Sequence, residues 1–294
     1  MNAAVEHLIQ ARKVQFDLTQ SPIYWAETPF VTHAINPLHI LLPQGELWFC
    51  RVFNRVLPEI TDPQLYADVK GFIGQEAVHS RSHSNVIEFY KQHDIDLTSF
   101  VRLTEVLFKD LVDELPLKQR WLAKLLGKNW LIFQVGTIAA IEHFTSILGM
   151  WVLEEKALNN FDPEILRLIR WHGAEEVEHR SVAFDLFQHL CKSKLGFYVG
   201  RQFTMSLIFP LFVVLWTRAV RFTIEQDPNI AKGQLPTSMF GILRAMEKEF
   251  EQSARLPSVK YIVKSVGSWM KPSYDPRKEG NDQLAAYYFK AYNF

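Results

Sequence analysis

The sequence predicts an all-α protein built around a four-helix bundle. Apolar residues recur with helical periodicity along most of the 294 residues, and Gly and Pro residues fall mainly between the periodic stretches. Two Asp-Pro pairs, Asp62-Pro63 and Asp162-Pro163, each combine an N-cap residue with a proline in the first helical position. Each pair therefore marks the start of a long helix.

The expected helices follow one another with short interruptions. We expect them at residues 1–13, from about 45 to 60, and at about 64–93, 101–115, 119–157, 162–191 and 236–254. Residues 1–195 would form the bundle. Residues 196–294 would form a helical extension packed on it, with an apolar segment at 203–216.

Composition excludes several classes of partner. The chain has 32 basic and 32 acidic residues and no Lys/Arg-rich arm, so we expect no nucleic-acid partner. Cys50 and Cys191 are far apart and form no CxxC pair, which is typical of reduced thiols in a cytoplasmic protein. The amphipathic, charged N-terminus is unlike a secretory signal.

Two Glu-x-x-His units carry the first chemical signal. They are Glu76–His79 and Glu176–His179. Residues three apart on a helix share one face, so a carboxylate and an imidazole at this spacing can reach one metal ion. One such unit is weak evidence, because Glu and His are common on solvated helix faces.

A further glutamate lies on the helix before each unit. Glu46 precedes the first unit, and Glu142 precedes the second within the apolar sequence TIAAIEHFTSIL. A buried carboxylate is costly unless it is paired or binds a metal, so Glu142 indicates either a metal ligand or a buried salt bridge. The order Glu, Glu-x-x-His, Glu, Glu-x-x-His is that of a ferritin-like di-metal carboxylate bundle.

Residues next to the motifs allow several roles. In related bundles an acidic residue before the ligand Glu accepts a hydrogen bond from the opposite metal-bound His. Glu175 fits this role, whereas Gln75 lacks the charge and leaves that side open. His83, one turn beyond His79, is a ligand, a hydrogen-bond partner of a ligand, or a solvent-facing residue. Glu178 is expected on the outer face.

The motifs also resemble known families. The stretch from about 15 to 200, including LPQGELWFCRVF, GFIGQEAVHSRSHSNV, AAIEHFTS and WHGAEEVEHRSVAFD, resembles the bacterial family labelled predicted metal-dependent hydrolases. The ligand spacing is similar to that of the di-iron arylamine N-oxygenases, which have a third His four residues before the second Glu-x-x-His. That position is His172 here. The resemblance implies this ligand set: Glu46, Glu76, His79, Glu142, His172, Glu176 and His179.

The expected chemistry follows from these ligands. A carboxylate-rich site with imidazoles suits two iron ions, although manganese and zinc also fit. The resemblance implies that Fe(II) ions activate O₂ to oxidise a small, hydrophobic substrate. No flavin or nicotinamide motif is visible, so an external electron donor or the substrate would supply electrons. The alternatives are hydrolysis by a metal-activated water and iron storage.

The apolar segment at 203–216 is too short to span a bilayer, and Pro210 would kink it. Arg201 on one side and Arg218 and Arg221 on the other suit a helix lying in a membrane interface. The alternatives are a buried helix or a homodimer interface. The expected location is cytoplasmic, with peripheral contact to the inner membrane in the first case.

Overall fold

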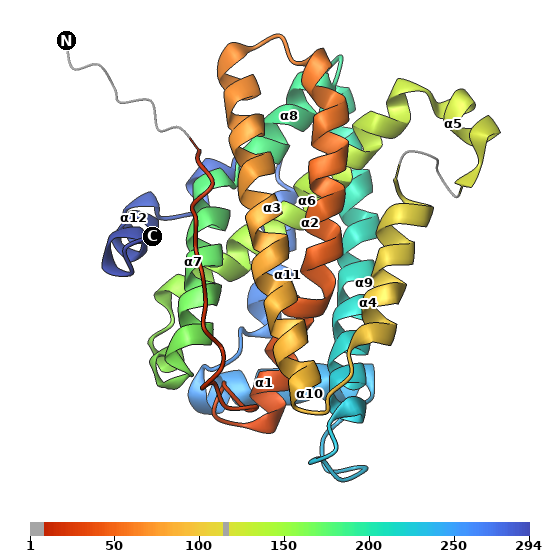
Figure 1. Cartoon of the computed structure of the whole chain (residues 1–294). Helices are drawn as coiled ribbons and strands as arrows, with labels where there is room; N and C mark the ends of the chain where they lie inside the picture. Colours follow the sequence, from red (N-terminus) through yellow and green to blue (C-terminus); the bar gives the residue numbers. More distant parts are fainter. Residues whose placement is uncertain (1–8, 114–117) are drawn as a thin grey trace.

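The computed structural model describes residues 9–113 and 118–294, and helices dominate it (Figure 1). Within these residues no strand occurs, so the prediction of an all-α protein is confirmed. Four long helices form the centre of the molecule, in two adjacent hairpins. The first hairpin pairs α2 (Pro37–Val56) with α3 (Pro63–Gln92), and the second pairs α6 (Lys128–Glu154) with α7 (Pro163–His179).

The Asp-Pro pairs start α3 and α7 as predicted. The side chains of Asp62 and Asp162 each accept hydrogen bonds from two backbone N–H groups in the first turn, and a proline occupies the first helical position. Because a helix leaves its first N–H groups unpaired, these caps fix where each helix begins. The caps therefore set the distance along the helix to each Glu-x-x-His unit.

Helix α2 begins earlier than the sequence predicted. It starts at Pro37 and continues through Pro43, whereas the prediction placed its start near Gly45. A proline inside a helix removes one backbone hydrogen bond, which usually ends the helix, but its fixed φ is compatible with the helical conformation. Packing against α3 supports this turn, where the Ser80 hydroxyl donates to the Pro43 carbonyl at 2.8 Å.

Two predicted helices are each divided in two. The predicted helix at 119–157 breaks at Gly127, which has φ +51°, into α5 and α6. The predicted helix at 162–191 breaks after His179 into α7 and α8. The other elements are α1 (Pro29–Ile35), η1 (Leu57–Glu59), α4 (Thr98–Glu105), the π-helical η2 (Val106–Leu111), α5 (Arg120–Leu126), η4 (Lys156–Asn160) and α8 (Val182–Leu190).

The N-terminal segment is not the helix that the sequence predicted. Residues 9–18 form an irregular strap along α7, and residues 1–8 of the predicted helix lie outside the described residues (Figure 1). The carbonyl of Gln15 accepts a hydrogen bond from Arg167 on α7. The strap also passes so close to α3 that a Cβ at Gly71 would collide with the backbone of Ile9.

The C-terminal part consists of α9 (Lys194–Gln226), α10 (Met239–Ser253), α11 (Val259–Trp269), η5 (Pro276–Lys278) and α12 (Asp282–Ala291). Helix α9 packs on α6, and α12 packs on α7. Among the described residues, α6 and α9 are long and apolar enough to cross a membrane by length and composition alone. The apolar window of α6 is 67% buried within the protein, whereas that of α9 is only 33% buried.

Two glycines set the distance between α6 and α7. A Cβ at Gly149 would lie 2.9 Å from the carbonyl oxygen of Gly173 and 3.2 Å from the Cβ of Glu176. Real Cβ atoms do not approach backbone this closely, so a side chain here would push the two helices apart. The contact therefore holds the helix of Glu142 against the helix of Glu176.

We expect Gly149→Ala to lower the free energy of unfolding by about 1–3 kcal/mol, because an added methyl overpacks this contact. It should also weaken metal binding, since the helices that carry the candidate ligands separate. Chemical denaturation and metal analysis measure both effects. Gly267→Ala, at a helical position with open space around it, is the control and should be neutral or stabilising. Equal stability of the two variants would contradict the role of this contact.

Candidate metal centre

The four central helices bring all seven candidate ligands together. Glu46 comes from α2, Glu76 and His79 from α3, Glu142 from α6, and the remaining three, His172, Glu176 and His179, from α7. None of these residues is more than 6% exposed. Their donor atoms form three overlapping groups in which all atoms lie within 4.8 Å of one another: Glu46–His79–His172, Glu76–His79–Glu176 and Glu76–Glu142–His179.

Two carboxylates stand between the two imidazoles of the Glu-x-x-His units. Nδ1 of His79 lies 3.5 Å from Glu76 and 3.6 Å from Glu176. Nε2 of His179 lies 3.4 Å from Glu76 and 3.3 Å from Glu176. Glu76 and Glu176 therefore lie between the two histidines, where their oxygens could contribute to metal binding on either side.

The two sides of this pair are not equivalent. On the His179 side, a carboxylate oxygen of Glu142 lies 3.1 Å from Nε2 of His179. On the His79 side, the additional donors are Glu46 and His172. Nε2 of His172 lies 2.6 Å from Glu176 and 3.9 Å from Glu46. One side thus has an extra imidazole.

The imidazoles of His79 and His179 are each oriented by a hydrogen bond to a residue of the opposite helix. Nε2 of His79, on α3, lies 2.9 Å from a carboxylate oxygen of Glu175 on α7. Nδ1 of His179, on α7, lies 2.9 Å from the amide oxygen of Gln75 on α3. A neutral amide oxygen accepts this hydrogen bond as a carboxylate would, so both rings can donate outward and turn their other nitrogen inward.

Arg12 connects these two outer contacts. Its Nη1 lies 2.8 Å from both Glu175 and Glu178, and Gln75 donates to Glu178 at 2.6 Å. The prediction that Glu178 lies on the outer face is wrong, because its side chain is only 3% exposed. No motif in the sequence indicates Arg12, because its contacts depend on the position of the strap in the fold.

Two further buried histidines, His83 and His39, form a line of contacting imidazoles that begins at His172. His83 contacts Nδ1 of His172 through its Nε2, and its Nδ1 lies 2.8 Å from Nδ1 of His39. Burial, and to a smaller extent the charge of the nearby His172, lowers the pKa of His39 to about 3. Burial also lowers the pKa of His83 well below its usual value. Both rings are therefore neutral. His83 fills the role of a hydrogen-bond partner to His172.

Sequence reasoning missed His39, although a signal was present. His39 lies seven residues before Glu46, which is about two helical turns and so the same face of α2. The prolines around it favour irregular structure, so the sequence alone does not place His39 on this helical face.

The electrostatics of the cluster call for cations. Burial and repulsion from neighbouring glutamates raise the pKa of Glu142 to about 8 and raise that of Glu46 well above its usual value. Burial disfavours protonated His79 and His179, but the hydrogen bond between His79 and Glu175 and the negative charges of the surrounding glutamates raise the pKa values of the two histidines. Protons thus neutralise the cluster where metal ions would otherwise do so.

Several inward-facing polar atoms also lack hydrogen-bond partners. They are both oxygens of Glu46, Glu76 and Glu142, Oε2 of Glu176, Nδ1 of His79 and Nε2 of His179. Buried polar groups without partners are costly and rare in folded proteins. Carboxylate and imidazole donors with this geometry fit two divalent cations.

The family comparison agrees with a metal site. The model of the family described as "Predicted metal-dependent hydrolase" matches residues 10–280. The chain belongs to this family. No curated protein and no solved structure matches this chain significantly.

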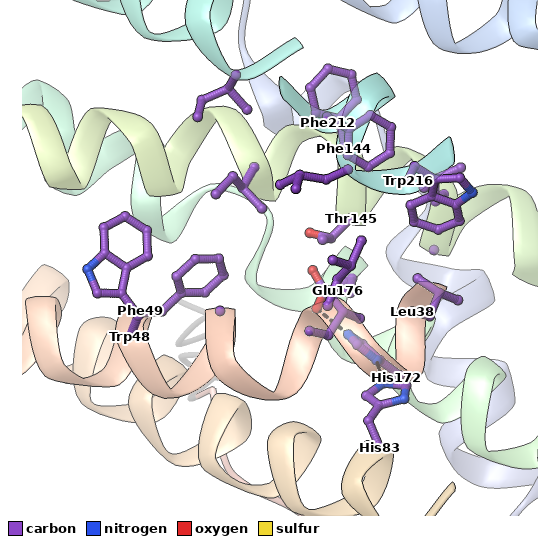
Figure 2. Close-up of a pocket in the computed structure, with 18 of the residues that line it drawn as sticks. Leu38, Trp48, Phe49, His83, Phe144, Thr145, His172, Glu176, Phe212 and Trp216 are labelled. Carbon is purple, nitrogen blue, oxygen red and sulfur yellow. Dashed lines mark hydrogen bonds and ion pairs between the residues drawn. The ribbon is translucent and has the colours of Figure 1, made fainter. Parts of the chain in front are cut away.

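In this member of the metal-dependent hydrolase family, a cavity of about 160 Å³ adjoins the cluster. Its wall is mostly aliphatic and aromatic, and of the seven candidate ligands only His172 and Glu176 line it. Figure 2 shows these two with His83 on one side of the cavity, and Phe144, Phe212 and Trp216 on the other. The side of the centre with the extra imidazole therefore faces this cavity.

We expect Glu76→Ala and His179→Ala to lose most bound metal while keeping their helical content. Glu76 is a donor in two of the three groups and His179 is the one imidazole of the third, and neither residue caps a helix. Metal analysis after reconstitution, together with circular dichroism, measures the two effects. Glu88→Ala, at an exposed position on the same helix as Glu76, should bind metal normally. Normal metal content in both site variants would refute this centre.

Metal binding should stabilise the protein more at about pH 8 than at about pH 6. In the metal-free protein, Glu142 keeps a proton up to about pH 8, whereas in the unfolded chain it loses this proton near pH 4.5. The unfolded state therefore binds fewer protons in this range, and rising pH destabilises the metal-free fold. The raised pKa values of His79 and His179 act in the same direction.

The measurement is the difference in Tm between metal-loaded and metal-free protein at the two pH values. Glu142→Gln removes one of the titrating groups, so the stability of its metal-free form should depend less on pH. A Tm difference that is the same at both pH values would contradict the competition between protons and metal.

Proposed function

We propose that this chain is a dinuclear metal enzyme that oxidises a small apolar substrate with O₂. The observation that carries the proposal is the pair of carboxylates, Glu76 and Glu176, between two oppositely placed histidines in a buried site. The order and helix origin of the donors are those of ferritin-like di-metal carboxylate bundles. Glu46, His79 and His172 would hold one ion, and Glu142 with His179 the other.

Two features support oxidation as the reaction. Carboxylates with a few imidazoles suit iron, which supplies the redox chemistry when it is bound. The adjoining cavity has a mostly apolar lining, which suits an apolar substrate beside the centre. The chain itself would hold the ions, keep both imidazoles oriented through Glu175 and Gln75, and position the substrate beside His172.

Hydrolysis is the second candidate, and the family description supports it. Two metal ions can lower the pKa of a bound water and stabilise a developing oxyanion. In this case the same cavity would hold an apolar ester or amide. Iron storage, the third reading of the sequence, has less support because the cavity suits an organic ligand.

Anaerobic reconstitution with Fe(II), followed by addition of O₂, distinguishes these functions. We expect about two irons per chain, rapid O₂ consumption and a transient visible absorption band, because a bridged pair of irons reacts as a unit. Glu76→Ala should show neither the stoichiometry nor the band.

Other outcomes would redirect the proposal. A centre that retains zinc or manganese, ignores O₂ and cleaves hydrophobic esters would establish hydrolysis instead. Continued iron uptake far beyond two per chain would indicate storage.

A further inference from the structure

A second cavity, of about 410 Å³, lies against the first on the side away from the metal centre. It is formed between α9, α10 and α11, together with parts of α1 and α6. The two cavities share six wall residues: Leu38, Leu148, Val152, Ile169, Phe212 and Trp216. They are therefore neighbouring spaces with a common wall.

The volumes of the cavities set limits on the ligand. A cavity of about 150 Å³ is known to hold one benzene ring, so the first cavity has room for only a small group beside the centre. The second falls within the range of roughly 300–1,000 Å³ that is usual for ligand sites. The second cavity therefore offers room for the remainder of a substrate larger than one ring.

The titratable residues of the two linings, His83, His172 and Glu176, all belong to the first cavity. Thr137 Oγ1 and Glu176 Oε2, from residues that line the first cavity, are buried without hydrogen-bond partners. The lining of the second cavity carries no charge, and its one hydroxyl, on Thr217, already donates to the carbonyl of Val213 at 2.8 Å. The indole N–H of Trp151 is the donor in this lining that lacks an acceptor.

The common wall contains two aromatic side chains of α9. Phe212 and Trp216 are one turn apart, with ring centroids 5.3 Å apart, and Phe144 of the first cavity stacks on Phe212 at 4.8 Å (Figure 2). The indole N–H of Trp216 donates to the carbonyl of Ala34 at 3.1 Å. At the other end, Phe240 is 73% exposed and Val263 is 51% exposed, so the second cavity reaches the protein surface there.

We propose that the second cavity binds the hydrocarbon tail of the substrate, a long-chain aliphatic molecule with a small polar head. The head lies beside His172 and Glu176, and the tail passes Phe212 and Trp216 towards the surface at α10 and α11. The position of the head rests on the proposed function, whereas tail binding depends on the apolar lining alone. The two can therefore be tested separately.

The test is competition of n-alkanols of increasing length against the fluorescent fatty acid cis-parinaric acid, on metal-free and metal-loaded protein. Burial of each additional methylene should tighten binding about fourfold until the tail fills the cavity, after which affinity levels off. Alkanols that bind with the same affinity whatever their length would overturn the proposal.

Leu243→Trp narrows the second cavity and lies outside the first. It should weaken binding of long alkanols at least tenfold and leave short alkanols and metal content unchanged. Val263→Trp, at the half-exposed mouth, tests the same cavity if the first variant does not fold. Leu195→Trp, the same change at a position on α9 that is 72% exposed and lines neither cavity, is the matched control.

The outcomes separate this inference from the proposed function. Long-chain binding that survives in Glu76→Ala and is lost in Leu243→Trp supports the tail site whatever the metal centre does. Long-chain binding in Leu243→Trp and Val263→Trp that equals that of Leu195→Trp overturns the tail site and leaves the metal centre standing.

Discussion

The structure depends on one electrostatic constraint: four glutamates face one another in a core from which water is excluded. Glu46, Glu76, Glu142 and Glu176 are each at most 3% exposed. Four uncompensated charges there would cost far more than the marginal stability of a domain. The cluster must therefore be neutralised, and its pKa shifts show that in the absence of metal it takes up protons. Two divalent cations would neutralise the same four charges and also provide partners for the orphaned polar atoms.

The same constraint extends to the residues around the cluster, where the two histidines have unequal support. His79 contacts the charged Glu175, which Arg12 holds in turn. His179 contacts the neutral Gln75, and the carboxylate on that side, Glu178, lies one hydrogen bond further out. A charged acceptor makes an imidazole a stronger donor to a metal than a neutral one does. The side with His79 and His172 therefore offers the stronger metal donors, and it is also the side that faces the cavity.

The apolar spaces complement this charged centre. The bundle provides rigid helices on which the donors are fixed, while α9, α10 and α11 form the walls of the larger cavity. The family match over residues 10–280 spans both the central helices and these walls. None of the seven candidate ligands lies in residues 196–294.

The sequence by itself determined the helical class, the starts of α3 and α7, and the set of donors that the fold brings together. These follow from local rules: an Asp-Pro cap acts within one turn, and a Glu-x-x-His unit shares a face whatever surrounds it. The tertiary structure decided the rest. Helix α2 passes through Pro43 because packing supports it, and the side chain of Glu178 is only 3% exposed because Arg12 and Gln75 contact it. The seven-residue spacing from His39 to Glu46 places both on one face of α2, but only the fold brings His39 against His83. Arg12 and the two cavities depend on contacts between segments far apart in the chain, and no periodicity or motif encodes such contacts.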